Sequence, residues 1–186
     1  MTDCGGALSQ VDGLLGELAE TRRRAETIFS GRAAEQVLRR PGEKRWSAAE
    51  CMEHLNITNR AYVPRISEAL GTLRQKNLAN KERFRLDWNA RLLKYWLEPP
   101  SRLRLPTGAA FQPIQVQDPA GVLSLFQALN LELEEKLAAA RGLALDAERI
   151  RSPFAENMQY SVYSAFVLIA AHNRRHLWQA ENALKV

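Results

Sequence analysis

The residues best suited to chemistry are three histidines, the only ones in the 186-residue sequence. Two of them, His172 and His176, are four positions apart in the segment VLIAAHNRRHLWQAENAL. On a helix this spacing places their Cβ atoms about 5–6 Å apart, so both imidazoles could bind the same cation. The pair continues an apolar stripe that includes Phe166 and Ile169, which predicts that both rings point inward.

His54 is the third candidate, because it lies two turns after Ser47 on the flank of the apolar face of another predicted helix. If this helix and the C-terminal helix are neighbours, three neutral imidazoles can converge and leave a coordination position for water or substrate. An alternative for the same histidines is a buried polar network with Asn173 and Gln179.

Helices are the elements expected to position these residues. Apolar side chains recur at helical spacing over residues 7–30. After a Pro-Gly break, the sequence SAAE is a capping box that starts a second helix near Ser47. This helix is expected to continue to about Leu73, with Pro64 as the position of a kink or of shifted hydrogen bonds.

The rest of the chain predicts a short helix over Phe84–Leu97, a third main helix from Pro119 to Gly142 and a fourth from Tyr160 to Leu184. Only the sequence IQVQ alternates, so no strand is predicted. The expected fold is therefore all-α, a four-helix bundle with a long crossover at about 74–118 between the second and third helices, in one domain spanning 1–186.

The composition, with 46% hydrophobic and 25% charged residues, is typical of a soluble globular protein. We found no signal sequence or membrane-spanning segment, which predicts a cytoplasmic protein with no membrane partner. Cys4 and Cys51 are expected to be reduced thiols. The net charge of +5 is interpreted as a solvated basic surface, because acidic residues interrupt the basic stretch 74–104. A nucleic-acid partner is therefore not expected.

Four further segments are RWSAAECMEHL (45–55), SRLRLPTGAAFQP (101–113), SPFAENMQYS (152–161) and AAHNRRHLWQAENAL (170–184). In order and spacing, over nearly the whole chain, they together resemble the DinB/YfiT-like superfamily of metalloenzymes. The resemblance implies a four-helix bundle with a long crossover between the second and third helices. It also implies a divalent metal bound by His54, His172 and His176, although three nitrogen ligands do not distinguish Zn, Ni, Fe and Mn.

The resemblance further implies a metal-dependent enzyme that acts on a small-molecule substrate. Members of the superfamily include enzymes that use bacillithiol, mycothiol or glutathione, so an S-transferase with a low-molecular-weight thiol is the specific form we expect. A bound metal would lower the pKa of a coordinated thiol or water. The alternative is a non-catalytic metal-binding or stress-associated module whose partner is another protein or a second copy of this chain, in a homodimer.

Several other residues are assigned more ordinary roles. Glu50 is expected to cap its helix and Glu53 to be solvated, with a supporting role beside His54 as the alternative. Arg174 and Arg175 are expected to diverge from the histidine stripe, with Arg175 pairing across helices or with the crossover. Within the crossover, Arg102 and Arg104 are candidates to bind the carboxylates of a thiol cofactor. The aromatic residues that could line an acceptor pocket, although most should be core or boundary residues, are Trp46, Tyr62, Trp88, Trp96, Tyr160, Tyr163 and Trp178.

Overall fold

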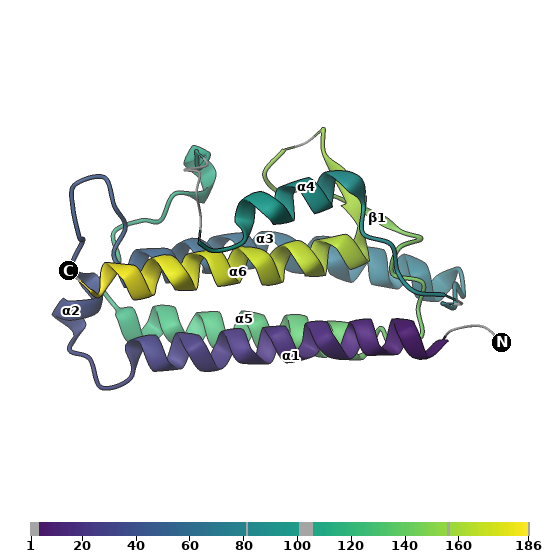
Figure 1. The fold of residues 1–186 in the computed structure, drawn as a ribbon, viewed down its shortest axis with the longest axis horizontal. Coiled ribbons are helices and arrows are strands. Elements are labelled where there is room, and N and C mark those ends of the chain that lie inside the picture. Colours follow the sequence, from purple (N-terminus) through teal and green to yellow (C-terminus); the bar gives the residue numbers. More distant parts are fainter. Residues whose placement is uncertain (1–3, 81, 101–105, 156, 186) are drawn as a thin grey trace.

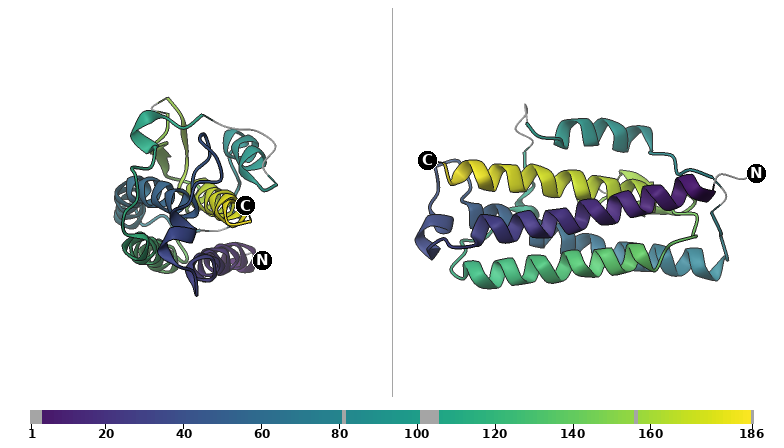
Figure 2. Two further views of the ribbon diagram at one scale, coloured as in Figure 1. Left: turned by 90° about the vertical axis from the view of Figure 1, so that its left-hand side faces the viewer. Right: turned by 60° about the horizontal axis from the view of Figure 1, so that its bottom comes forward.

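Four long helices form a bundle in the computed structural model, which describes residues 4–80, 82–100, 106–155 and 157–185. Both α1 and α3 pack against α5 and α6, so α1 and α3 occupy opposite corners of the bundle (Figures 1 and 2). The predicted all-α four-helix bundle is confirmed. The bundle helices are α1 (Cys4–Phe29), α3 (Ala48–Gln75), α5 (Pro119–Ala138) and α6 (Val162–Ala183).

The long crossover between α3 and α5 is also confirmed. These two helices run in the same direction, so the chain must return along the bundle between them (Figure 1). On this return it forms α4 (Trp88–Leu97), which packs on α6, and the 3₁₀ helix η1 (Ala109–Phe111), which contacts α3. The predicted arginines Arg102 and Arg104 lie outside the described residues.

Polar side chains fix where the helices that carry the histidines begin. The Ser47 hydroxyl accepts from the backbone N–H of Glu50, and the Glu50 carboxylate accepts from the backbone N–H of Ser47. At the start of α6, Ser161 accepts from the backbone N–H of Ser164. Each cap satisfies an N–H group that has no partner within its helix. The capping box predicted from the sequence is therefore present, and it fixes the start of α3.

The ends of some helices differ from the predicted ends. The crossover helix α4 begins at Trp88 instead of Phe84, because the side chain of Gln10 binds both the N–H and the carbonyl of Phe84. The third bundle helix ends at Ala138, and the chain reaches Gly142 through a turn in which this glycine has a φ of 84°. A short helix that was not predicted, α2 (Ala34–Leu38), lies between α1 and α3.

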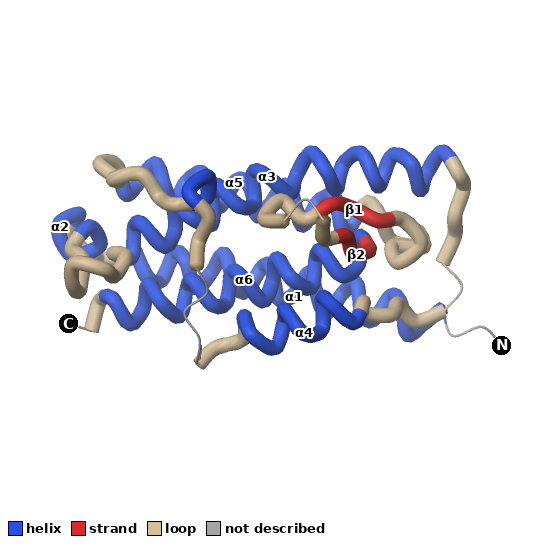
Figure 3. The backbone as a smooth tube through the Cα atoms, turned by 90° about the horizontal axis from the view of Figure 1, so that it is seen from above, coloured by secondary structure: helices blue, strands red, loops and turns tan. Residues whose placement is uncertain are grey.

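The prediction of no strands was wrong. A two-stranded antiparallel hairpin, β1 (Arg149–Arg151) and β2 (Gln159–Ser161), precedes α6 (Figure 3). Ile150 and Tyr160 are opposite each other in this hairpin, and both are buried. Strands of three residues are too short for side-chain alternation to reveal them in the sequence.

The interior of the bundle consists of two hydrophobic clusters separated by a polar layer. On α3 the larger cluster starts at Tyr62 and the smaller one ends at Leu55, and buried polar side chains lie between them. The same order recurs on α6, where the polar residues lie between Ala171 and Leu177. The buried polar residues of this layer are Asn56, Thr58, Asn59, Asn130, His172, Asn173, Arg175 and His176, and it also includes His54, which directly precedes Leu55.

In the part of the chain that the structure describes, no helix has the length and apolar character needed to cross a membrane.

Candidate metal centre

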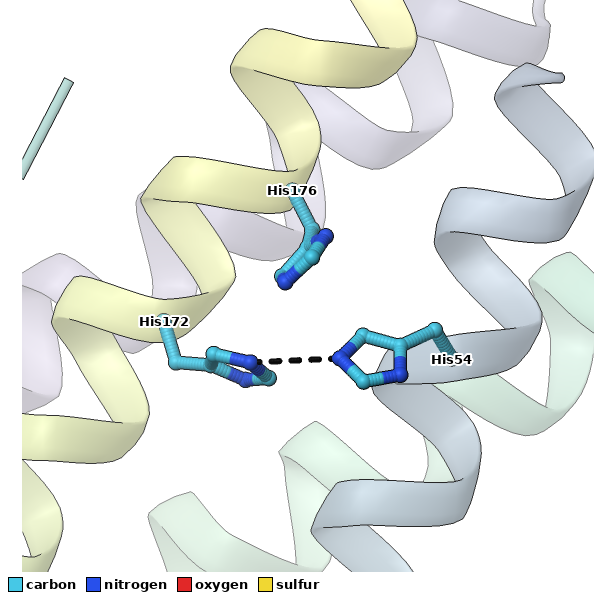
Figure 4. A group of neighbouring side chains, drawn as sticks. All are labelled: His54, His172 and His176. Carbon is cyan, nitrogen blue, oxygen red and sulfur yellow. Dashed lines mark hydrogen bonds between the residues drawn. The ribbon is translucent and has the colours of Figure 1, made fainter. Parts of the chain in front are cut away.

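The polar layer brings the three histidines of the chain together. His54 comes from α3, and His172 and His176 come from α6, which packs against α3. Each offers a ring nitrogen, and these nitrogens lie within 4.8 Å of one another. Figure 4 shows the three rings pointing toward one another between the two helices. All three side chains are buried, with exposed fractions of 2% to 9%.

The spacing of the ring nitrogens suits a metal site. The Nε2 atoms of His54 and His172 are 3.3 Å apart. Two nitrogens bound to one tetrahedral zinc ion at about 2.0–2.1 Å would be about 3.3 Å apart. The ring centroid of His176 lies 4.4 Å from that of His54 and 4.5 Å from that of His172, so its nitrogen can approach the same point.

The tautomer of His54 is set by the crossover. Its Nδ1 atom donates a hydrogen bond to the backbone carbonyl oxygen of Phe111, at 2.7 Å. A carbonyl oxygen can only accept, so Nδ1 carries the proton and the neutral ring presents a lone pair on Nε2. Metal-binding histidines are commonly held in this way by a backbone carbonyl.

The surroundings keep the histidines neutral. Burial lowers the pKa of His54, and the bond to Phe111 only partly opposes this effect. Burial also lowers the pKa values of His172 and His176 far below the usual value, and repulsion from neighbouring imidazoles and Arg175 adds to the effect. Neutral imidazole is the form that binds metal ions. The Nδ1 atom of His176 is buried and has no hydrogen-bond partner among the described residues, a situation that an ion or water molecule would relieve.

A cavity of about 1120 Å³ adjoins the three histidines. It lies between α3, α6 and the crossover, and all three histidines are part of its wall. Aromatic rings flank them, with the centroid of Trp46 5.0 Å from His54 and that of Phe154 5.7 Å from His172. The cavity is large enough for a small organic molecule.

The alternative polar network forms in part, because Asn173 pairs with other asparagines and Gln179 reaches a histidine. Asn173 donates to Asn130 at 2.9 Å and accepts from Asn59 at 3.5 Å. Gln179 lines the cavity, and its side-chain hydrogen bond to His176 opposes the lowering of the pKa of that histidine by burial. The histidines are therefore adjacent to the asparagine network and remain directed toward one another and the cavity.

The two glutamates near His54 do not support it. The carboxylate of Glu50 accepts from the backbone of Ser47 in the capping box and forms an ion pair with Arg40. Glu53 is partly exposed, and its nearest polar partner is the side chain of Asn56 at 3.4 Å. The capping role predicted for Glu50 is thus observed.

The expectation for the arginines was only half right. Arg174 turns away from the site and pairs with Glu17 and Glu98. Arg175 donates to the carbonyl of Trp96 in the crossover at 2.9 Å, as expected, but it also lines the cavity. The reason is that Arg175 is three residues after His172, only about 60° around the helix, within reach of a long side chain.

Three of the seven aromatic residues proposed for a pocket do line the cavity, namely Trp46, Tyr62 and Trp178. Two aromatic residues that were not predicted, Phe111 and Phe154, also line the cavity, and their ring centroids are 4.7 Å apart. The remaining proposed residues are core residues (Tyr160, Tyr163) or are exposed on α4 (Trp88, Trp96).

The model of the DinB superfamily matches residues 17–180 of the sequence. The chain belongs to the DinB superfamily. A solved structure with a similar fold is YfiT from Bacillus subtilis, described as a probable metal-dependent hydrolase with an unusual four-helix bundle topology. It is 16% identical to this DinB-superfamily chain, with a TM-score of 0.61 over 95% of this chain and 87% of YfiT. No protein of curated function matches the sequence significantly.

Proposed function

We propose that this DinB-superfamily chain is a metal-dependent enzyme that holds a divalent cation with His54, His172 and His176 and acts on a small molecule in the adjoining cavity. The observation that carries the proposal is the convergence of three buried, neutral histidines at the wall of this cavity. Structural metal sites are usually closed by four protein ligands, whereas three ligands beside a cavity leave a position open.

The residues around the histidines have distinct roles in this proposal. The carbonyl of Phe111 holds His54 with Nε2 as the donor atom. Trp46 and Phe154 pack against the imidazoles and form part of the apolar surroundings of the site. The three imidazoles are neutral donors and do not offset the charge of a cation. A divalent cation bound here would act as a Lewis acid and lower the pKa of a water or thiol ligand.

The finer form of the proposal is an S-transferase that uses a low-molecular-weight thiol. The sequence resemblance favours this form, and the raised pKa of the Cys51 thiol is consistent with it. Cys51 lines the cavity, but burial raises the pKa of its thiol to about 12, so it is a poor internal nucleophile. The nucleophilic thiol would therefore come from a small molecule. Hydrolysis is the second candidate, because YfiT is described as a probable metal-dependent hydrolase.

Metal analysis is the first experiment. Untagged protein is stripped with chelator, reconstituted separately with Zn²⁺, Ni²⁺, Fe²⁺ and Mn²⁺, and assayed for bound metal per chain. We expect one ion per chain in wild type and in the control Glu53→Ala, which alters the residue next to His54. His172→Ala should bind none. Failure of all four metals to bind stoichiometrically to wild type would overturn the proposal.

Activity assays then separate the two reactions. Metal-loaded wild type and His176→Ala are incubated with an epoxide or chlorinated electrophile and bacillithiol, mycothiol or glutathione, and in parallel with ester and amide substrates without thiol. Thiol conjugation that His176→Ala lacks would support the transferase, and thiol-independent hydrolysis that it lacks would support the hydrolase. Equal rates in both proteins would contradict catalysis of these substrates at the histidine site.

A further inference from the structure

The described residues that line the cavity carry positive charge and no carboxylate. Four of them are basic, namely Lys44, Arg45, Arg175 and Lys185, and none is an aspartate or glutamate. The whole chain has 21 acidic side chains, so their absence from this lining is a property of the cavity and not of the composition. A cavity with this lining attracts anions and repels cations.

The basic residues lie at two depths. Lys44, Arg45 and Lys185 are exposed, in the loop before α3 and just after α6. Figure 1 shows that both segments are at the same end of the bundle. Arg175 is buried, with 4% of its surface exposed, on the same helix as His172 and His176. An anion could thus be attracted by the exposed cations and held by the buried one.

The crossover orients Arg175 within the wall. Its NH1 group donates to the carbonyl of Trp96 at 2.9 Å. Burial lowers the pKa of Arg175, the direction expected for a cation that loses hydration, but guanidinium remains protonated at neutral pH.

The other walls favour an apolar body. Aromatic side chains line the cavity from α3, α6, η1 and the loop between β1 and β2, and the leucines Leu93 and Leu97 line it from α4. Pockets of this kind take ligands that bury an apolar surface and use a few polar groups for orientation. The cavity therefore combines an apolar lining with a buried guanidinium.

From this combination we infer that the cavity selects a small organic acid with an aromatic or branched apolar body, and that Arg175 pairs with its carboxylate. The inference rests on the proposed function and names the substrate class for the same site. Guanidinium and carboxylate match in geometry and can form two parallel hydrogen bonds. The three neutral histidines contribute no negative charge that would oppose this pairing.

Binding of 3-phenylpropionate and its uncharged amide tests the inference. Their affinities are measured by calorimetry for metal-free and metal-loaded protein, with metal content determined in parallel. We expect wild type to prefer the acid by about tenfold or more, because a buried charge-assisted hydrogen bond replaces a neutral one. Arg175→Gln should reduce this preference to about threefold or less. The control Arg91→Gln, which removes the same charge from an exposed position on α4, should retain it.

A measurement on wild type covers the case in which Arg175→Gln does not fold. In protein with ¹⁵N-labelled arginine, the Arg175 Nε–H resonance should shift when the acid is added and stay in place with the amide. Equal affinities for acid and amide in wild type would overturn the inference. An acid preference that Arg175→Gln leaves unchanged, as expected if the carboxylate binds a metal ion instead, would also overturn it.

These outcomes are distinguishable from failure of the proposed function. Acid preference that depends on Arg175 in a protein that binds no metal would contradict the metal-dependent enzyme and leave the anion site in place. Stoichiometric metal binding without acid preference would contradict the anion site alone.

Discussion

The Nδ1 atom of His54 lies 2.7 Å from the carbonyl oxygen of Phe111, a residue 57 positions away in the sequence. This contact joins a bundle helix to the 3₁₀ helix of the crossover. The crossover therefore returns the chain along the bundle and also sets which nitrogen of His54 is available to a ligand. Changes in the crossover should alter the histidine site even where they leave the bundle intact.

Replacing Phe111 with alanine is expected to weaken metal binding. The Phe111 ring packs on Phe154, so its loss should loosen η1 and the carbonyl that orients His54. Loss of a residue that orients a metal ligand typically costs about 10–100-fold in affinity. Competition with a chromophoric chelator measures this change. Ile114→Ala, at a position in the same crossover that is 74% exposed, is the control and should bind as wild type does. Equal affinities for the two variants would show that the contact is not needed.

The bundle is expected to fold without metal. Two hydrophobic clusters hold the helices together on either side of the polar layer, so His172→Ala should keep the helical circular dichroism spectrum of wild type. Metal at about 100 times its Kd should stabilise wild type by about 2.7 kcal/mol, because it binds only the folded state. His172→Ala should show no such increase in thermal unfolding temperature. Loss of helical signal from chelated wild type would indicate a structural metal instead.

The sequence predicted the parts of the fold that depend on local signals. Ser47 and Glu50 form the expected capping box, and the i,i+4 pair His172 and His176 points inward from a regular helix. These features follow from helical periodicity and from hydrogen bonds between residues near in sequence. The family resemblance added the partnership of α3 and α6, which brings His54 to the pair.

Features that depend on contacts distant in sequence could not be predicted in the same way. The start of α4 depends on the side chain of Gln10, and the tautomer of His54 depends on the backbone of Phe111, whose carbonyl has no side-chain signature. Arg175 was expected to diverge from the histidine stripe, but it lies only about 60° around the helix from His172, and its long side chain reaches the cavity wall. The single-domain assignment for residues 1–186 stays a prediction.

Cys51 is expected to be unreactive in the folded protein. Only 2% of its surface is exposed, and burial together with the charge of Glu50 raises the pKa of its thiol to about 12. A Cys4→Ser variant isolates this thiol. It should not react measurably with a disulfide reagent at pH 8 in native buffer, and should react with one equivalent in guanidinium chloride. Rapid reaction of the native variant would return Cys51 to consideration as a nucleophile in the cavity.

Asp87 is expected to stabilise the junction of α4 and α6 in a pH-dependent manner. Its carboxylate accepts from the backbone N–H of Ser161 at 2.7 Å and from Arg149 at 3.0 Å. Burial disfavours its charged form, but hydrogen bonds from Ser161, Ser164 and Arg149 outweigh this effect and lower its pKa to about 2.

The folded pKa of Asp87 lies below the unfolded value of about 3.9, so the stabilisation should be complete above about pH 5 and disappear as the pH falls toward 2. Asp87→Asn should lower the free energy of unfolding by about 2 kcal/mol at pH 7, and the difference from wild type should shrink between pH 4 and 2. Urea unfolding of wild type and Asp87→Asn at pH 7, 5 and 3 measures this difference in the free energy of unfolding. Asp12→Asn, which breaks an exposed pair with Arg141, is the control and should cost less than about 1 kcal/mol. A difference between wild type and Asp87→Asn that is the same at pH 7 and pH 3 would mean that the Asp87 charge does not stabilise this junction.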